Sequence, residues 1–230
     1  MAKILSLETS TPVCSVALHD SGNIMGLKEI EENGAHSEKL IKLIEELLDE
    51  LQVDRKEVDA IAVSEGPGSY TGLRIGVSTA KGLAFAWGKP LIAVSTLAAL
   101  ARGATLDENN SSVVIAMLDA RRMEVYREIF DANMNSMVKL DSEIVEEDSF
   151  SDYLNKSKVV FIGDAVLKVK EVIRHSNAVF SDKRISASEV GEIAWEKYQN
   201  QVFEDIAYFV PNYLKELKVL KSKKNPLLRI

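Results

Sequence analysis

The feature that most constrains the fold is one order of predicted elements that occurs twice along the chain. In the first copy, three strand-like segments precede a helix, a strand, a helix and a strand, at 3–7, 13–19, 23–31, 36–51, 60–64, 71–87 and 91–94. In the second copy, the same order ends on a helix, at 113–118, 124–130, 137–145, 146–154, 159–162 and 166–175. The copies share this order and not their residues, so the repeat is one of architecture.

A three-stranded meander that leads into parallel strand–helix crossovers, used twice, is typical of one fold class. It indicates an α/β protein with the duplicated ribonuclease-H-like fold, the two-subdomain (ASKHA) arrangement of actin and hexokinase. A polar, turn-rich stretch at 103–112 separates the copies. We therefore expect an N-terminal subdomain over 1–103 and a C-terminal subdomain over 112–210, followed by a basic tail over 211–230 that is free to pack back on the first subdomain.

The composition is that of a globular chain. Of its 230 residues, 46% are hydrophobic and 27% are charged, which excludes collagen-like and disordered classes. Apolar runs such as 113–118 are much shorter than the roughly 20 residues that span a bilayer, and the N-terminus leads straight into a strand. We therefore expect neither a membrane segment nor an export signal. A single cysteine, Cys14, allows no internal disulfide and suits a cytoplasmic protein.

Charge is distributed unevenly along the chain. The net charge is −7, and this field repels a phosphate backbone, so nucleic-acid binding is not the design of the whole molecule. Residues 211–230 hold six basic residues against one acidic residue, a net of +5, which leaves −12 for residues 1–210. The tail is therefore either a solvated end or a basic arm for an RNA or an acidic partner.

The first predicted helix has an unusually wide apolar side. Its apolar residues fill an arc of about 160° on a helical wheel, whereas a helix that lies on one sheet needs about 100°. They are Leu40, Ile41, Leu43, Ile44, Leu47, Leu48 and Leu51. Two interpretations follow: a helix sunk deeply in its own core, or a helix that binds a partner.

The second predicted helix carries a ridge of small residues with a spacing of four. They are Gly72, Gly76, Ala80 and Ala84. Each interior glycine lowers helix stability by about 1 kcal/mol relative to alanine, so the ridge indicates a demand for close packing. Packing against the chain's own sheet and pairing with a helix of another molecule both remain open.

Two segments are candidates for phosphate contact. The glycine-rich segment 64–72 lies between a strand and a helix, but it has neither a P-loop lysine nor a dinucleotide fingerprint, so a tight turn capped by Ser69 or Thr71 is favoured. The second candidate is the end of the first predicted strand, where Thr and Ser commonly act only as caps, at Glu8, Thr9 and Ser10.

The histidines do not form a metal motif. His19, His36 and His175 are scattered, and the chain has no His-x-x-x-His pattern and no pair of cysteines. The spacing therefore predicts no metal site.

Several segments together resemble one family. They are ILSLETST at 4–11, SVAL at 15–18, AHSE at 35–38, the stretch from SEGPG to TAKGLA at 64–84, LDAR at 118–121, IGD at 162–164 and PNYL at 211–214. These segments are spread over most of the chain, and through them it resembles the TsaB (YeaZ) family. Members of that family are bacterial subunits for making the threonylcarbamoyl modification of the adenosine beside the tRNA anticodon.

The resemblance implies a non-catalytic scaffold or activator subunit without cofactor or metal. It implies pairing with the catalytic relative TsaD through the first two long helices, a larger complex with the ATPase TsaE, and contact with tRNA through that complex. The residues then expected at the TsaD contact are His36, Leu40, Leu43, Ile44, Leu47, Gly72, Leu73, Gly76, Ala80 and Ala84.

The chain departs from the catalytic relatives at three places. TsaD looks similar through the glycine-rich helix but carries a His-x-x-x-His metal motif after the next strand, where this chain has Thr96 and Leu100, which cannot replace imidazole on a transition metal. The double-glycine turn that the catalytic relatives use near the nucleotide reads Gly163-Asp164-Ala165 here, and the acidic side chain argues against an adenine nucleotide. Glu8 stands where many TsaB proteins look to have Asp, which weakens a transferred magnesium argument.

Two alternatives stay open at this point. One is an enzyme that acts alone, either an actin-like-fold ATPase or kinase or a glycoprotease-like metallopeptidase. The other is a homodimer that uses the same two helices when no partner is available, since an exposed apolar face can be self-complementary.

Overall fold

The computed structural model describes residues 1–32, 34, 36–106 and 112–214. The predicted basic tail beyond Leu214 and the middle of the predicted linker lie outside the described residues.

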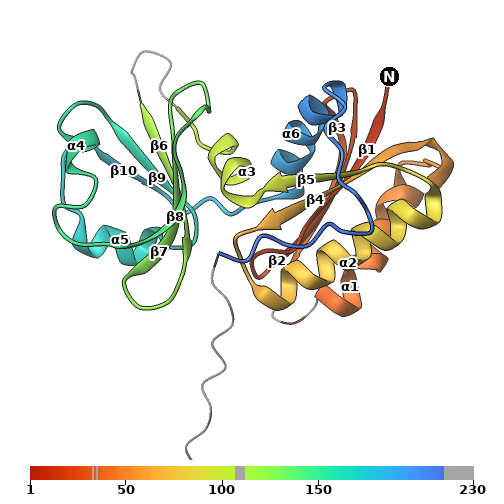
Figure 1. The fold of residues 1–230 in the computed structure, drawn as a ribbon, viewed down its shortest axis with the longest axis horizontal. Helices are drawn as coiled ribbons and strands as arrows, with labels where there is room; N and C mark the ends of the chain where they lie inside the picture. Colours follow the sequence, from red (N-terminus) through yellow and green to blue (C-terminus); the bar gives the residue numbers. More distant parts are fainter. Residues whose placement is uncertain (33, 35, 107–111, 215–230) are drawn as a thin grey trace, which may run out of the picture.

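Two five-stranded sheets form the two lobes of the molecule (Figure 1). The first has the order β3-β2-β1-β4-β5, with β1 (Lys3–Glu8), β2 (Val13–Asp20), β3 (Asn23–Glu31), β4 (Val58–Gly66) and β5 (Leu91–Ser95). The second has the order β10-β9-β6-β7-β8, with β6 (Val113–Asp119), β7 (Glu124–Phe130), β8 (Ser136–Ile144), β9 (Val159–Ile162) and β10 (Ala178–Ser181). In both sheets an antiparallel meander continues into two parallel strands, which confirms the predicted duplicated ribonuclease-H-like fold.

Six α-helices lie in the described part of the chain. They are α1 (His36–Glu50), α2 (Tyr70–Trp87), α3 (Thr96–Arg102), α4 (Ser151–Leu154), α5 (Val166–Val172) and α6 (Ala187–Gln199). The sequence patterns predict α1, α2 and α5 and place a longer helix where α4 forms. They miss α3, α6 and strand β10.

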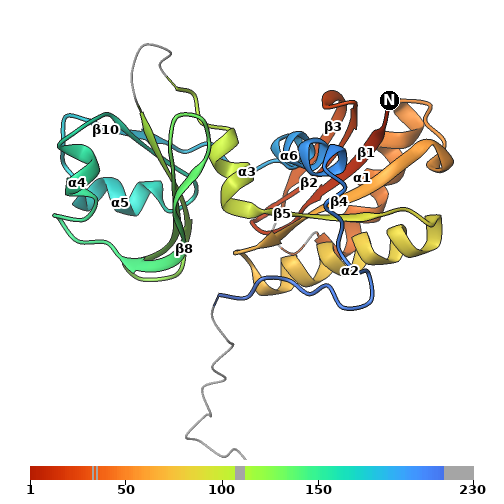
Figure 2. The same cartoon turned by 45° about the horizontal axis from the view of Figure 1, so that its top comes forward.

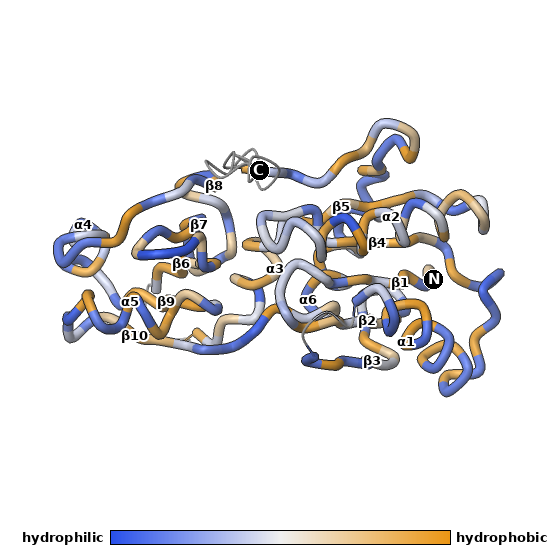
Figure 3. The backbone as a smooth tube through the Cα atoms, turned by 90° about the horizontal axis from the view of Figure 1, so that it is seen from below, coloured by the Kyte–Doolittle hydropathy of each residue, from blue (hydrophilic) through white to orange (hydrophobic). Residues whose placement is uncertain are grey.

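The first sheet is covered on both faces. Helices α1 and α2 lie side by side on one face, and α6 lies on the other (Figure 2). Because side chains alternate along a strand, Leu5 and Leu7 of β1 enter the core under α1 and α2, whereas Ile4 enters the core that α6 shares. Apolar residues recur along the strands and these helices (Figure 3).

Where the two lobes meet, each contributes a helix that packs against the other. Helix α6 follows the second sheet in the sequence but packs against the strands of the first, while α3 contacts β6 and β7 of the second sheet. Leu97 of α3, Leu118 of β6 and Val190 of α6 are buried in one common core. The predicted subdomain 112–210 therefore contributes a helix to the first lobe.

The last described residues, 204–214, form a C-terminal strap along α2 (Figure 1). The side-chain nitrogen of Lys81 donates to the carbonyl oxygens of Ala207 and Phe209, and Phe209 is buried in the core under α1 and α2. The backbone N–H of Asn212 donates to the carbonyl oxygen of Glu65. The start of the segment predicted as a tail thus packs on the first lobe.

Among the described residues, no helix combines the length and apolar character that crossing a lipid bilayer requires.

Candidate functional site

The side chains predicted to contact a partner are turned into the chain's own core. His36, Leu40, Ile44, Leu47, Leu73, Ala80 and Ala84 are each at most 8% exposed, and Leu43 is half-buried. The prediction that these side chains form a docking surface is therefore corrected. The wide apolar arc of α1 is needed because the helix packs on β2 and β3 below it and on α2 beside it.

The glycines in the ridge of α2 are required by packing within the chain itself. A Cβ on Gly72 would lie 2.0 Å from the carbonyl oxygen of Thr9, and a Cβ on Gly76 would lie 2.1 Å from the Thr9 hydroxyl oxygen. That hydroxyl donates to the carbonyl oxygen of Gly72 over 2.8 Å. The two glycines thus let the loop after β1 approach the helix backbone, so they are not available for close contact with a partner.

Two side-chain hydrogen bonds help to position these helices. Ser69 caps α2 by accepting from the backbone N–H of Gly72 over 3.2 Å, as the favoured tight-turn interpretation predicts. At the start of α1, the Nε2 atom of His36 donates to the carbonyl oxygen of Thr11 over 2.9 Å. The backbone N–H of Ser69 also donates to the carbonyl oxygen of Ser10 over 2.7 Å, so the start of each helix is bonded to the β1–β2 loop.

The outward side of α2 is a different surface, and we call it the outer stripe: Thr71, Arg74, Ser78, Gly82 and Phe85. These residues follow one another at a spacing of three or four, and all are exposed. Phe85 is 81% exposed, and nothing lies within 4 Å of a Cβ built on Gly82. On the neighbouring helix α1, Ile41 is 47% exposed. The two helices thus present apolar and small residues that no described part of the chain covers.

The candidate phosphate contacts at Glu8, Thr9 and Ser10 are all buried. One oxygen of the Glu8 carboxylate accepts from both the backbone N–H and the hydroxyl of Ser10. Burial raises the pKa of Glu8. The N–H group that an anion would use is therefore already bonded to a carboxylate of the chain.

In the β6–β7 loop, backbone N–H groups are likewise bonded to carboxylates of the chain. Asp164 accepts from the backbone N–H of Asp119 over 2.8 Å, and Asp119 accepts from that of Arg121 over 2.6 Å. The ammonium of Lys168 lies 2.7 Å from Asp119 and also donates to the carbonyl oxygens of Arg122 and Glu124. In both loops the acidic side chains thus already accept hydrogen bonds from groups of the chain itself.

A row of buried polar side chains lies between α6 and the first sheet, and the sequence patterns do not reveal it. It consists of Ser6, Glu8, Ser15, His19 and Ser64 on the strands and Glu189 on α6. Within the described residues, Ser6 Oγ and the Oε2 atoms of Glu8 and Glu189 have no hydrogen-bond partner. Burial lowers the pKa of His19. The alternation of polar and apolar residues in β1 is the one signal that points to this row.

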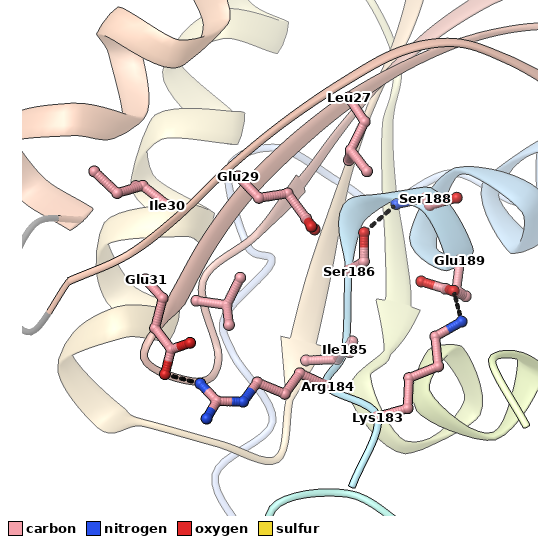
Figure 4. A pocket seen from close by; sticks show the side chains of 11 residues that line it. Leu27, Glu29, Ile30, Glu31, Lys183, Arg184, Ile185, Ser186, Ser188 and Glu189 are labelled. Carbon is pink, nitrogen blue, oxygen red and sulfur yellow. Dashed lines mark hydrogen bonds and ion pairs between the residues drawn. The ribbon is translucent and has the colours of Figure 1, made fainter. Parts of the chain in front are cut away.

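Two adjoining cavities form what we call the acidic cleft. The first, of about 590 Å³, lies between β3 and the segment that leads into α6, and Glu29 and Glu189 line it (Figure 4). The second, of about 230 Å³, lies between the lobes, and Asp164 and Asp182 line it. The two share Glu31, Arg184 and Ile185, and Glu31 forms an ion pair with Arg184.

Thr96 and Leu100, which the sequence resemblance sets against a metal motif, both serve the core. The Thr96 hydroxyl accepts from the backbone N–H of Gly66 over 3.1 Å, and Leu100 is 2% exposed in the core between the lobes. In the described part of the chain, no group of three His, Cys, Asp or Glu side chains is arranged to hold a metal ion.

Known proteins similar to this chain share both its sequence and its fold. A family model described as TsaD: tRNA N6-adenosine threonylcarbamoyltransferase matches residues 31–226. Proteins named tRNA threonylcarbamoyladenosine biosynthesis protein TsaB are 39% identical over 123 residues in Haemophilus influenzae and 37% identical over 124 residues in Escherichia coli. The solved structure of YeaZ from Pseudomonas aeruginosa matches with a TM-score of 0.79 and 28% identity, and the match covers 93% of this chain and 100% of that one.

The chain belongs to the TsaB (YeaZ) family. The resemblance seen in the sequence segments is thereby confirmed. Because the TsaD model covers most of this TsaB-family chain, the chain is also a member of the wider family that this model describes. The two alignments with TsaB proteins cover 54% of this chain and only about half of the relatives' own length, 51% and 53%.

Proposed function

We propose that the chain is a non-catalytic subunit in tRNA threonylcarbamoyladenosine biosynthesis. It pairs with a TsaD-type transferase through the outer stripe of α2 and the exposed side of α1. The pair then engages the ATPase TsaE, and tRNA is reached through the assembled complex. The names of the TsaB relatives and the match to the TsaD family model support this assignment of pathway.

The observation that carries the proposal is that Gly82 is exposed in the interior of α2 and has open space around it. An exposed glycine in the interior of a helix lowers helix stability by about 1 kcal/mol relative to alanine. Unlike Gly72 and Gly76, Gly82 makes no close contact within the chain that a side chain would prevent. Together with the neighbouring Ser78 and the exposed Phe85, it suits the close approach of a helix from another molecule.

A partner of the same fold fits this surface. A TsaD-type protein would carry its own counterparts of α1 and α2, so two such pairs can pack face to face around an approximate twofold axis. The same geometry permits a homodimer of this chain when no partner is present. The internal bonding of Glu8, Asp119 and Asp164 supports a subunit that leaves nucleotide chemistry to its partners.

The test is complex formation between the chain and its host's TsaD, measured by size-exclusion chromatography with light scattering. In the monomer, the leucine of Gly82→Leu extends into open space. In the complex, it would clash with the closely packed helix of the partner. We expect its affinity to fall by about fivefold to 150-fold, because overpacking a close interface costs about 1–3 kcal/mol.

Lys170→Leu is the matched control, since it places the same side chain on the exposed side of α5. It should pair as the wild type does. Pairing of Gly82→Leu at wild-type affinity would contradict the proposed surface, and a wild-type chain that forms neither a heterodimer nor a homodimer would contradict the scaffold function. The measured masses distinguish the two kinds of dimer.

A further inference from the structure

The C-terminal strap meets the outer stripe of α2 at one charged side chain. Arg74 belongs to the outer stripe, and its Nε atom donates to the hydroxyl oxygen of Tyr213 in the strap over 3.3 Å. The two residues are 139 positions apart in the sequence. The proposed pairing uses the small and apolar residues of the outer stripe and leaves both this arginine and the strap without a role.

Two tyrosines hold the guanidinium group of Arg74. Its central carbon lies 4.0 Å from the centroid of the Tyr70 ring, a cation–π contact with the residue one turn earlier on α2. The ring of Tyr213 packs on that of Tyr70, and the two centroids are 4.9 Å apart. The strap itself is fixed next to Tyr213, where the backbone N–H of Asn212 donates to the carbonyl oxygen of Glu65 over 2.7 Å. The guanidinium is therefore held in a defined orientation, although Arg74 is exposed.

The charge of Arg74 has no counter-ion within the described part of the chain. Helix α2 carries two charged residues, Arg74 and Lys81. The ammonium of Lys81 donates to the carbonyl oxygens of Ala207 and Phe209 in the strap. No described carboxylate lies within ion-pairing distance of Arg74. Because Tyr213 engages only Nε, the two terminal nitrogens of the guanidinium remain for an acceptor outside the described residues.

Close pairing along the outer stripe would remove this charge from water. Arg74 lies one turn from Ser78, so a helix that packs along the stripe covers the guanidinium as well. A charge buried without a partner is strongly unfavourable, whereas a carboxylate that accepts from both terminal nitrogens compensates for the lost hydration. The small and apolar neighbours suit a protein helix, and the net charge of −7 repels the phosphates of RNA.

We propose that Arg74 is the charged anchor of the pairing surface, and that it binds an aspartate or glutamate carboxylate on the facing helix of the TsaD-type partner. Its two terminal nitrogens donate to the two carboxylate oxygens. Tyr213 is a positioning residue, because it holds Arg74 through Nε and so reduces the conformational entropy that the arginine loses on pairing. The inference rests on the proposed function, since it assigns one contact within the same pairing surface.

The experiment is calorimetric titration of the host's TsaD with the full chain at low and at high salt. Arg74→Gln should lower the affinity by about 30-fold or more, the effect of truncating one member of a desolvated charge pair. Its affinity should also depend less on salt than that of the wild type, because no ion pair is left to screen. Arg174→Gln is the matched control, since it makes the same change of charge at an exposed position after α5, and it should bind as the wild type does.

A double-mutant cycle tests the positioning role of Tyr213. Tyr213→Phe keeps the aromatic ring and removes the hydroxyl that accepts from Arg74, so the affinity should fall by about fivefold, the effect of one hydrogen bond. The hydroxyl has nothing to hold once the guanidinium is absent, so the double variant should bind as Arg74→Gln does. A tyrosine with a merely structural role would weaken binding equally in both backgrounds, which would contradict the positioning role.

Hydrogen exchange at the backbone N–H of Asn212 reports whether the strap stays docked in each variant. The inference is overturned if Arg74→Gln pairs with wild-type affinity, and the proposed function then stands. Loss of affinity together with faster exchange at Asn212 would overturn it as well, because Arg74 would act only by holding the strap. Normal pairing with weaker binding of tRNA by the complex would assign Arg74 to a phosphate of RNA instead. A wild-type chain that does not pair with TsaD would contradict the proposed pairing, and the inference would fall with it.

Discussion

The two faces of the first sheet are built from the same strands and differ in their chemistry. Toward α1 and α2, the strands present Leu5, Leu7, Val16 and Leu18 in a purely apolar core. Toward α6, the alternate positions present the buried polar row of Ser6, Glu8, Ser15, His19 and Ser64. The contribution of the apolar face to stability therefore depends on side-chain volume and close packing, whereas that of the polar face depends on protonation. Substitutions on each face test this distinction.

The largest expected loss of stability comes from a substitution on the apolar face. Gly76→Leu places a side chain where Thr9 already lies, at 2.1 Å from the new Cβ. Overpacking of this kind should lower the free energy of unfolding by about 3 kcal/mol, so the variant loses its partner because its fold is weakened. Urea unfolding measures the loss, and Gly82→Leu on the same helix is the control. Equal unfolding midpoints for the two variants would show that the inner and outer sides of α2 are not distinct.

A smaller effect is expected on the polar face, where burial lowers the pKa of His19. The unfolded chain binds a proton at His19 more readily than the folded chain does, so stability is lost as the pH falls through the unfolded value of about 6.5. Between pH 7.5 and 5.5 this group should remove stability, by at most about 1.4 kcal/mol. His19→Gln abolishes that contribution, and urea unfolding at each pH measures it.

Glu8 acts in the opposite direction on the same face. Burial raises its pKa, so the folded chain holds this proton more tightly, and its contribution to stability is lost as the pH rises through the folded pKa. Because Glu8 is present in both proteins, the difference between wild type and His19→Gln isolates His19. An identical pH dependence of the two proteins would mean that His19 does not titrate with folding.

The sequence patterns predict the apolar face toward α1 and α2 better than the polar face toward α6. Period-two alternation and the apolar arc of α1 are local signals, and they suffice for the sheets, α1 and α2. The sequence patterns miss helix α6, whose partners are remote in sequence: Gly191 packs on His19, and Trp195 lies against Gly22. They leave phosphate contact open at Glu8 because no local pattern shows that its carboxylate bonds Ser10. They place the docking side chains on the inner sides of the helices because an apolar stripe is the same in sequence whether a sheet or a partner covers it.

The smallest expected effect separates the folding of α2 from its binding. Gly82 has open space around it and lies in the helix interior, so Gly82→Ala should raise the free energy of unfolding of the isolated chain by up to about 1 kcal/mol. The same methyl group stands on the outer stripe and should weaken pairing with TsaD, although less than leucine does. Stability rises and affinity falls in one variant only if the glycine serves a contact outside the chain. Urea unfolding and titration of TsaD measure the two quantities, and a variant that is more stable and binds equally well would show that the outer stripe does not approach a partner closely at Gly82.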